Sequence, residues 1–348
     1  MNPLSVLITG LLFLIVIFIL LRPENGLWAR IRNRGRQKQR ILLEDTLKHL
    51  YDHEYHHRAA TLSSISGALG LSRDKTTQML KRLIELKLAT YKDGQWLLTP
   101  EGRGYAIRIL RIHRLWERYL ADETGVSETD WHRQAEIREH HISSEEAERL
   151  YEAMGRPVYD PHGDPIPNRL GELPPQTGQP LTRIEPGHRA RIIHLEDEPV
   201  VLFEQLTAEG LYPGMHIRVE RNDEDKVVIR GDGREIPLAP VVAANITVVP
   251  VEAPPNVEES PTTGRTLAQT HPGETVVVTA LSPALRGLQR RRLMDLGIVP
   301  GTRITRELVS MGGDPVAYNI RGALIALRND QARYINVKQM MEENEHVM

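Results

Sequence analysis

The segment 61–100, TLSSISGALG LSRDKTTQML KRLIELKLAT YKDGQWLLTP, contains two helix starts, a turn and a tight hairpin in close succession. Thr61 and Ser72 are residue types that cap helix N-termini, and Gly70 between them predicts a turn. Asp93-Gly94 is a signature of a two-residue hairpin, and Thr99-Pro100 starts another helix. The apolar side chains of the second helix recur at helical spacing and are expected to face inward: Met79, Leu80, Leu83 and Ile84. The order predicts a winged helix-turn-helix.

The outer face of the second helix carries side chains suited to nucleic acid. Cationic groups that pair with phosphates alternate there with polar groups that read base edges in a major groove. The predicted DNA-binding residues are Ser72, Arg73, Lys75, Thr76, Thr77, Gln78 and Lys81. Two other interpretations stay open, because a basic helix face can be merely solvated and winged helices also mediate protein contacts.

Composition restricts the kinds of partner and metal site. The 348 residues hold 44 Lys plus Arg and 46 Asp plus Glu, so a nucleic-acid surface must be a local patch. There is no cysteine, which excludes disulfides, thiolate zinc sites and iron–sulfur clusters. Any metal must therefore be held by nitrogen and oxygen ligands.

The N-terminus predicts a membrane anchor. Residues 4–21, LSVLITGLLFLIVIFILL, lack charge, and at about 1.5 Å per residue they nearly cross a bilayer core of about 30 Å. The basic residues follow this run and none precedes it: Arg22, Arg30, Arg32, Arg34, Arg36, Lys38 and Arg40. This asymmetry predicts a single-pass protein of the cell membrane with its C-terminal bulk in the cytoplasm. A cleaved signal peptide is the alternative, although a positive n-region and a small-residue cleavage site are both missing.

The C-terminal half contains an internal repeat. Residues 210–214, GLYPG, recur as GIVPG at 297–301, each after a short helical pattern and before alternating β-branched runs. Two proline-rich stretches, 165–180 and 251–264, are expected to be extended linkers around the first copy. We therefore expect two small β-barrels of one type.

Histidines and carboxylates gather at helical spacing between the winged helix and the barrels. On one predicted helix His132, Glu136, Glu139 and His140 share a face, and on the preceding helix His113 and Glu117 are one turn apart. Each pair alone is an ordinary polar pair. Two adjacent helices that both offer nitrogen and carboxylate ligands fit a divalent first-row metal.

These residues resemble the diphtheria toxin repressor family of metal-dependent transcription factors over roughly residues 41–340. The resemblance is carried by His113-Arg114-Leu115-Trp116-Glu117, by His132 through His140, and by Asp160-Pro161-His162-Gly163-Asp164-Pro165-Ile166-Pro167. The barrels resemble the small Src-homology-3-like domain of the family and the FeoA domain of iron transport systems.

The resemblance implies two metal sites. Asp45, Glu136, Glu139 and His140 correspond to the primary site, and His113, Glu117 and His132 to the ancillary one. The carboxylates of Asp45 and Glu136 resemble the manganese-responsive branch and favour Mn(II) or Fe(II) as cofactor. Lys48, however, stands where that branch has a further carboxylate, and Glu196 and Glu198 do not align securely with the ligands that the barrel supplies in relatives.

The sequence as a whole predicts an α+β multidomain chain. The expected parts are an anchor (1–22), a basic segment (23–40), a winged helix (41–104), a metal-binding and dimerisation domain (105–164), a linker (165–180), the first barrel (181–250), a linker (251–264) and the second barrel (265–338). The predicted function is a homodimeric, membrane-anchored, Mn(II)- or Fe(II)-dependent regulator that binds double-stranded DNA. The alternative is a tethered sensor that contacts a metal transporter without DNA. An enzyme is not expected, because HExxH, a nucleophile elbow and a phosphate-binding loop are all missing.

Overall fold

The computed structural model describes residue 12 and residues 27–175, 177–251 and 265–339. The chain divides into two compact units, the first ending at Arg111 and including Arg169–Gly171, the second holding the remainder. The anchor predicted at residues 4–21 lies outside the described residues except for Leu12. Among the described residues, no helix has the length and apolar character needed to span a bilayer.

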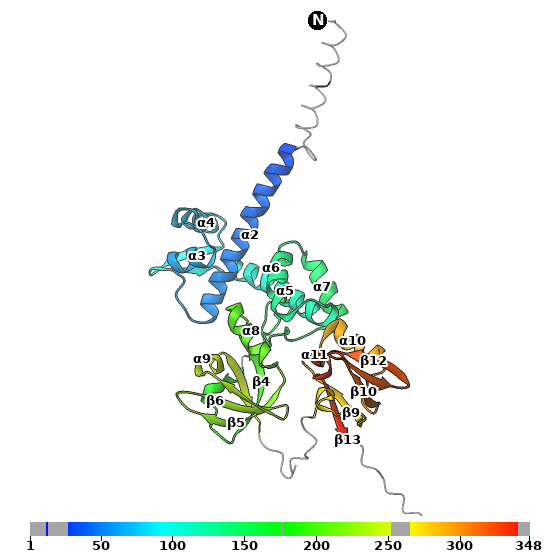
Figure 1. The fold of residues 1–348 in the computed structure, drawn as a ribbon. Helices are drawn as coiled ribbons and strands as arrows, with labels where there is room; N and C mark the ends of the chain where they lie inside the picture. Colours follow the sequence, from blue (N-terminus) through cyan, green and yellow to red (C-terminus); the bar gives the residue numbers. More distant parts are fainter. Residues whose placement is uncertain (1–11, 13–26, 176, 252–264, 340–348) are drawn as a thin grey trace, which may run out of the picture. The chain divides into compact units, whose positions relative to one another are not determined.

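The first unit is the predicted winged helix, which follows a long helix in the chain (Figure 1). Its elements are α2 (Leu27–Tyr55), α3 (Leu62–Ala68), α4 (Arg73–Glu85), β1 (Ala89–Lys92), β2 (Gln95–Leu98) and the first half of α5 (Pro100–Glu123). Thr61 forms a capping box with Ser64, and the Ser72 side chain accepts the Lys75 N–H. Both helix starts therefore lie where the sequence predicts them. The prediction that Ile84 faces inward is wrong, because its side chain is 43% exposed.

The wing forms through the predicted hairpin. Asp93 and Gly94 both have positive φ, 51° and 80°, and connect β1 and β2 in antiparallel register. Such a turn matches the twist of a strand pair. The wing leads directly into α5, where Gly102 lies so close to Leu88 that a Cβ would be 1.8 Å from its carbonyl oxygen.

The second unit begins with the rest of α5, followed by a short turn η1 (Glu128–Asp130), α6 (Trp131–Glu139) and α7 (Ser144–Ala153). Ile112, Leu115, Ala147 and Ile166 form a buried apolar cluster here. Ile166 lies in the stretch 165–180 that the sequence assigned to a linker. That assignment is wrong at its start, because Pro165, Ile166 and Pro167 are buried against the helices.

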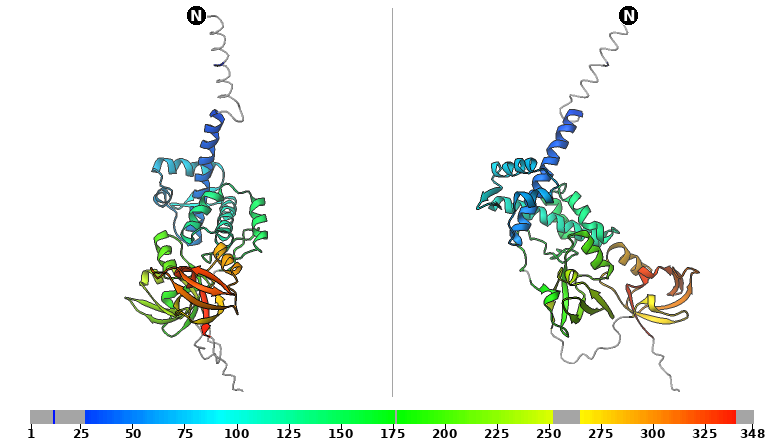
Figure 2. Two further views of the ribbon diagram at one scale, coloured as in Figure 1. Left: turned by 45° about the vertical axis from the view of Figure 1, so that its right-hand side comes forward. Right: turned by 60° about the vertical axis from the view of Figure 1, so that its left-hand side comes forward.

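The first barrel is a six-stranded antiparallel sheet with its own core, drawn in green in Figures 1 and 2. Its elements are β3 (Gln179–Pro180), η2 (Leu181–Arg183), β4 (Arg189–Leu195), α8 (Val200–Ala208), β5 (His216–Asn222), β6 (Val227–Gly231), β7 (Arg234–Leu238), α9 (Pro240–Ala243) and β8 (Ile246–Pro250). The strand order is β3-β8-β4-β5-β6-β7. Both β3 and β7 are therefore edges of this sheet.

The second barrel repeats the design with five strands, coloured yellow to red in Figure 2. Its elements are η3 (Leu267–Gln269), β9 (Thr275–Leu281), α10 (Gly287–Asp295), β10 (Arg303–Val309), β11 (Val316–Ile320), β12 (Ala323–Leu327), α11 (Asn329–Ala332) and β13 (Ile335–Gln339). The strand order is β12-β11-β10-β9-β13. The predicted repeat is thus confirmed, with α8 equivalent to α10 and β7 equivalent to β12.

Candidate metal centre

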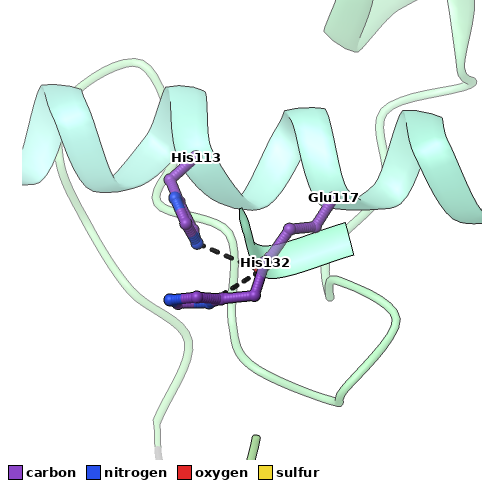
Figure 3. A group of neighbouring side chains, drawn as sticks. All are labelled: His113, Glu117 and His132. Atoms are coloured by element: carbon purple, nitrogen blue, oxygen red, sulfur yellow. Dashed lines mark hydrogen bonds and ion pairs between the residues drawn. The ribbon is translucent and has the colours of Figure 1, made fainter. Parts of the chain in front are cut away.

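The centre is built on α5 and α6. His113 and Glu117 are one turn apart on α5 and are only 4% and 2% exposed. Figure 3 shows both side chains projecting from the same side of the helix toward His132, which lies on α6. The His113 Nε2 and Glu117 Oε1 atoms are 3.0 Å apart, and His132 Nδ1 is 3.2 Å from the same oxygen. The predicted ancillary ligands are therefore brought together.

The first barrel adds carboxylates to this group. His132 Nδ1 is 3.1 Å from Asp197 Oδ2, and His132 Nε2 is 3.2 Å from Glu198 Oε1. Both acids lie between β4 and α8, well over fifty residues beyond His132 in the chain. The sequence offers Glu198 without a secure alignment to a ligand, and it gives no signal for Asp197.

Electrostatics at the centre favour charged side chains. Burial would raise the pKa of Glu117, but the charge of His113 and hydrogen bonds from His113 and His132 hold it well below its usual range. Burial would lower the pKa of His132, but hydrogen bonds with Asp197, Glu117, Glu136 and Glu198 raise it strongly. A group of carboxylates whose charge is compensated by protonated histidines is suited to a divalent cation, which would replace those protons.

A second potential ligand group shares Glu117. His162, Asp197 and Glu117 each offer a donor atom, and these three atoms lie within 4.8 Å of one another. His162 is 1% exposed, and neither of its ring nitrogens has a hydrogen-bond partner among the described residues. Its ring contacts two aromatic rings, those of Trp131 and Phe203, with centroids 5.9 and 4.7 Å away. His162 lies within a motif that carries the family resemblance, but the sequence predicts no role for it because it has no helical spacing to the other ligands.

The loop that carries His162 also holds the first barrel in place. Asp160 Oδ1 accepts the backbone N–H groups of His162, Gly163 and Asp164, which closes the loop tightly. Gly163 has φ 101°, and a Cβ there would be 1.9 Å from the carbonyl oxygen of Ile193 on β4. The Leu195 N–H donates to the carbonyl of His162 at 2.9 Å. This docking is what brings Asp197 within reach of His132.

The predicted primary ligands are divided between the two units. Glu139 and His140 are buried at the end of α6, whereas Glu136 is exposed and lies 3.6 Å from His132 Nε2. Asp45 lies on α2 in the first unit, so its participation stays a prediction. Glu139 contacts both parts of the centre, because one oxygen pairs with His113 Nδ1 and the other is 3.6 Å from His140 Nε2. It thereby orients His113 with Nε2 directed toward Glu117.

The donor set fits a divalent first-row metal. It consists of imidazole nitrogens and carboxylate oxygens, which are ligands for Mn(II), Fe(II) and Zn(II). It differs from the tetrahedral cysteine sites that hold structural zinc. The buried, unbonded nitrogens of His162 are an independent sign of a missing partner, because buried polar atoms are normally hydrogen-bonded. Two groups that share Glu117 would each hold such an ion: His113 and His132 complete one, and His162 and Asp197 complete the other.

On α4 most of the side chains that the sequence predicts to face DNA are exposed. Arg73, Lys75, Gln78 and Lys81 are exposed, and the Thr77 hydroxyl donates to the Arg73 carbonyl. Ser72 is exposed and serves as the N-cap. The prediction that Thr76 contacts DNA is wrong. Its side chain is fully buried, accepts a hydrogen bond from Ser66 and donates one to the Ser72 carbonyl. It holds α3 against α4 and cannot contact a base.

Comparisons with known proteins agree with this geometry. The model of the iron dependent repressor metal binding and dimerisation domain matches residues 99–168, and the FeoA domain matches residues 179–250 and 265–339. The diphtheria toxin repressor of Corynebacterium glutamicum is 34% identical over 166 residues, 44% of this chain and 72% of that protein. The iron-dependent repressor IdeR of Mycobacterium leprae is 29% identical over 209 residues, 54% of this chain and 88% of that protein. A manganese-dependent transcriptional repressor in complex with manganese is 26% identical, with a TM-score of 0.56 over 60% of this chain and all of that one.

A relative this similar over 72% of its own length assigns the chain to a class, the metal-dependent transcriptional regulators, which are not enzymes. The chain belongs to the diphtheria toxin repressor family and carries two FeoA domains after its metal-binding and dimerisation domain.

Proposed function

We propose that this protein is a Mn(II)- or Fe(II)-dependent regulator that binds DNA as a dimer and controls genes of metal-ion homeostasis. The observation that carries the proposal is the buried group around Glu117, where carboxylates from α5 and the first barrel meet histidines from α5, α6 and the loop at His162. Hard oxygen and nitrogen donors without sulfur favour these two ions among the first-row metals.

Metal and DNA are linked through α2 and α5. A bound cation supplies the positive charge that the crowded carboxylates lack. Without it, the approach of Asp45 to Glu139 is opposed by like charge, because both side chains are acidic. Metal binding would therefore favour the arrangement in which α2 is held in place. In a dimer this would fix the spacing of the two recognition helices α4, which suits DNA half-sites roughly 34 Å apart.

The deciding experiment is selection of duplexes from a random library at moderate salt. The protein lacking residues 1–22 would be used with Mn(II), with Fe(II) and with a chelator. We expect enrichment of one motif with either metal and little with the chelator. Glu117→Gln is the matched variant, since it alters the buried site and leaves α4 unchanged. A metal-loaded protein that enriches no sequence would remove the DNA-binding function and favour the tethered sensor that contacts a transporter.

We also propose that residues 4–21 anchor the protein in the cell membrane with the metal centre on the cytoplasmic side. Support comes from the uncharged run of residues and the seven basic residues that follow it in the sequence. An anchored regulator would have to find its operator from the membrane surface, so the two proposals are tested separately.

A further inference from the structure

The two barrels differ at equivalent sheet edges. β7 ends the first sheet and β12 ends the second, each after a two-residue turn. Asp232 and Gly233 have positive φ in one turn, as do Arg321 and Gly322 in the other. The two edge strands, REIPL and ALIAL, can therefore be compared residue by residue.

The turn determines which backbone groups point outward. In a two-residue hairpin the closing pair exchanges hydrogen bonds, and the pairs then alternate along the strands. The closing pairs are Gly231 with Arg234 and Ile320 with Ala323. The second and fourth residues of each edge strand thus direct their N–H and C=O groups away from the sheet. These are Glu235 and Pro237 in β7, and Leu324 and Ala326 in β12.

The first barrel protects its edge and the second does not. At β7, Pro237 has no N–H to offer and Glu235 places a charge beside the open edge, two features that prevent strand addition. At β12 the same positions are apolar, the strand has no charged residue, and Leu324 is 61% exposed. Among the described residues, no strand pairs with the outer side of β12. Figure 1 shows this strand at the margin of the second barrel.

An apolar surface continues from this edge onto the outer face of the sheet. Ala326 pairs with Ala317, and Ala317 pairs with Leu308 on β10, which is 64% exposed. Met311, in the turn after β10, is fully exposed. A strand added to β12 would therefore gain main-chain hydrogen bonds and apolar contact together.

We propose that β12 pairs antiparallel with β12 of a second copy of this chain. With a two-fold axis at Ile325, Leu324 lies opposite Ala326 of the other copy. The four outward-pointing N–H and C=O groups of each strand then form hydrogen bonds with those of the other strand, and a large side chain lies opposite a small one. No like charges meet within the strands. A second copy is the occupant because the chain carries a dimerisation domain and the edge is complementary to itself. The proposal does not depend on DNA binding.

The absence of cysteine makes a direct test possible in the full-length chain. In the proposed register the two Ile325 residues form a non-hydrogen-bonded pair with Cα atoms about 4.5 Å apart, a distance that a disulfide spans. Ile325→Cys should give a covalent dimer on mild oxidation, resolved by non-reducing electrophoresis. Leu324→Cys is the matched control, because its counterpart is displaced by two residues and lies too far away.

Edge protection supplies the second half of the test. Leu324→Glu with Ala326→Pro copies into β12 the residues with which β7 folds, and neither change removes a bond to β11. In the Ile325→Cys background this pair of changes should reduce the covalent dimer at least tenfold. The proposal is overturned if Ile325→Cys cross-links no more than Leu324→Cys, or if the protected variant cross-links equally well.

A measurement without cysteine covers the case in which Ile325→Cys does not fold. Hydrogen exchange of the unmodified chain should show slowed exchange of the Leu324 and Ala326 N–H groups, which point away from β11 and have no strand partner among the described residues. Exchange of these two groups as fast as in an open edge strand would reject the pairing, whichever other surface holds the two copies together.

Discussion

Asp197 is the residue that connects the first barrel to the metal centre. Burial would raise its pKa, but the hydrogen bond with His132 and the charges of His162 and His132 together lower it, so Asp197 is an anion beside the histidines. Asp197→Asn should weaken Mn(II) binding by about tenfold or more, the scale on which ligands and their partners act. Titration calorimetry would measure this, with Asp223→Asn on the same barrel as control, because Asp223 is exposed and pairs only locally with Arg221. Equal affinity of Asp197→Asn and the unmodified protein would exclude Asp197 from the centre.

His194 gives stability a specific dependence on pH. Burial would lower its pKa, but the hydrogen bond and charge of Asp164, 3.6 Å away, raise it above 6.5. A raised pKa means that the interaction stabilises the folded state fully below pH 6.5 and is lost as pH rises through the folded value. His194→Gln should therefore lower the melting temperature clearly at pH 6 and little at pH 9.

The control for this comparison is His216→Gln, since His216 is exposed on β5. Thermal unfolding of the three proteins at both pH values separates the outcomes. A loss of stability by His194→Gln that is equal at pH 6 and pH 9 would show that the Asp164 pair does not act through charge.

Single residues also show where sequence reasoning reaches its limit. His113 and Glu117 could be paired from sequence because a helix brings residues four apart onto one face. Asp197 and His162 could not, because their proximity to His132 depends on how a barrel packs on a loop, and Gly163 marks that packing only once the backbone is known. Asp45 was assigned through resemblance alone and stays a prediction.

At the scale of one element, α4 carries one buried threonine among the side chains that are predicted to face DNA. Thr76→Val removes the hydrogen bond from Ser66 on α3 and the bond to the Ser72 carbonyl at the start of α4, and it should cost about 1 kcal/mol of unfolding free energy. Thr77→Val is the control, because its hydroxyl bonds only to Arg73 one turn earlier. Denaturant titration would measure both, and equal stability of the two variants would contradict the role given to Thr76.

The exposed cation Lys81 on the same helix should act on DNA instead. Lys81→Ala is expected to weaken binding to all sequences and to lower the salt dependence by about one unit of slope, as loss of one phosphate contact does. Fluorescence anisotropy over a salt series measures the slope. An unchanged slope would mean that Lys81 does not face DNA.

Periodicity predicted the elements well and their buried faces less well. The capped starts of α3 and α4 and the Asp93-Gly94 turn follow from local chemistry. Whether Thr76 or Ile84 is buried depends on the angle at which α3 crosses α4, and helical spacing does not specify that angle. The same applies to Ile166, which a proline-rich context assigned to a linker although the helices bury it.

At the scale of the whole molecule, the anchor proposal makes a simple prediction. The full-length protein should sediment with membranes and resist an alkaline wash, because an apolar helix of about eighteen residues is held by the hydrocarbon core. Deleting residues 1–22 should release it. Full-length protein recovered in the soluble fraction would exclude an anchor, and an N-terminus cleaved near Arg22 would indicate a signal peptide.

The domain order was predictable from sequence because composition, turn residues and the repeat change sharply at the boundaries. The presence of the helical parts and of two FeoA domains was confirmed, and the FeoA domain matches residues 179–250 and 265–339. The unit boundary differs, since it falls inside α5 after Arg111 rather than before Tyr105. A helix that continues through a boundary leaves no signal in composition.

Glu117 belongs to both ligand groups, and this has a consequence for how the protein reads metal in the cell. Two sites that share one carboxylate share its negative charge, so a cation in one reduces what the other offers. Successive ions should then bind with decreasing affinity, and occupancy should rise over a wide span of concentration. The response of such a sensor would change gradually with metal concentration, and it would not switch between two states at a single threshold concentration.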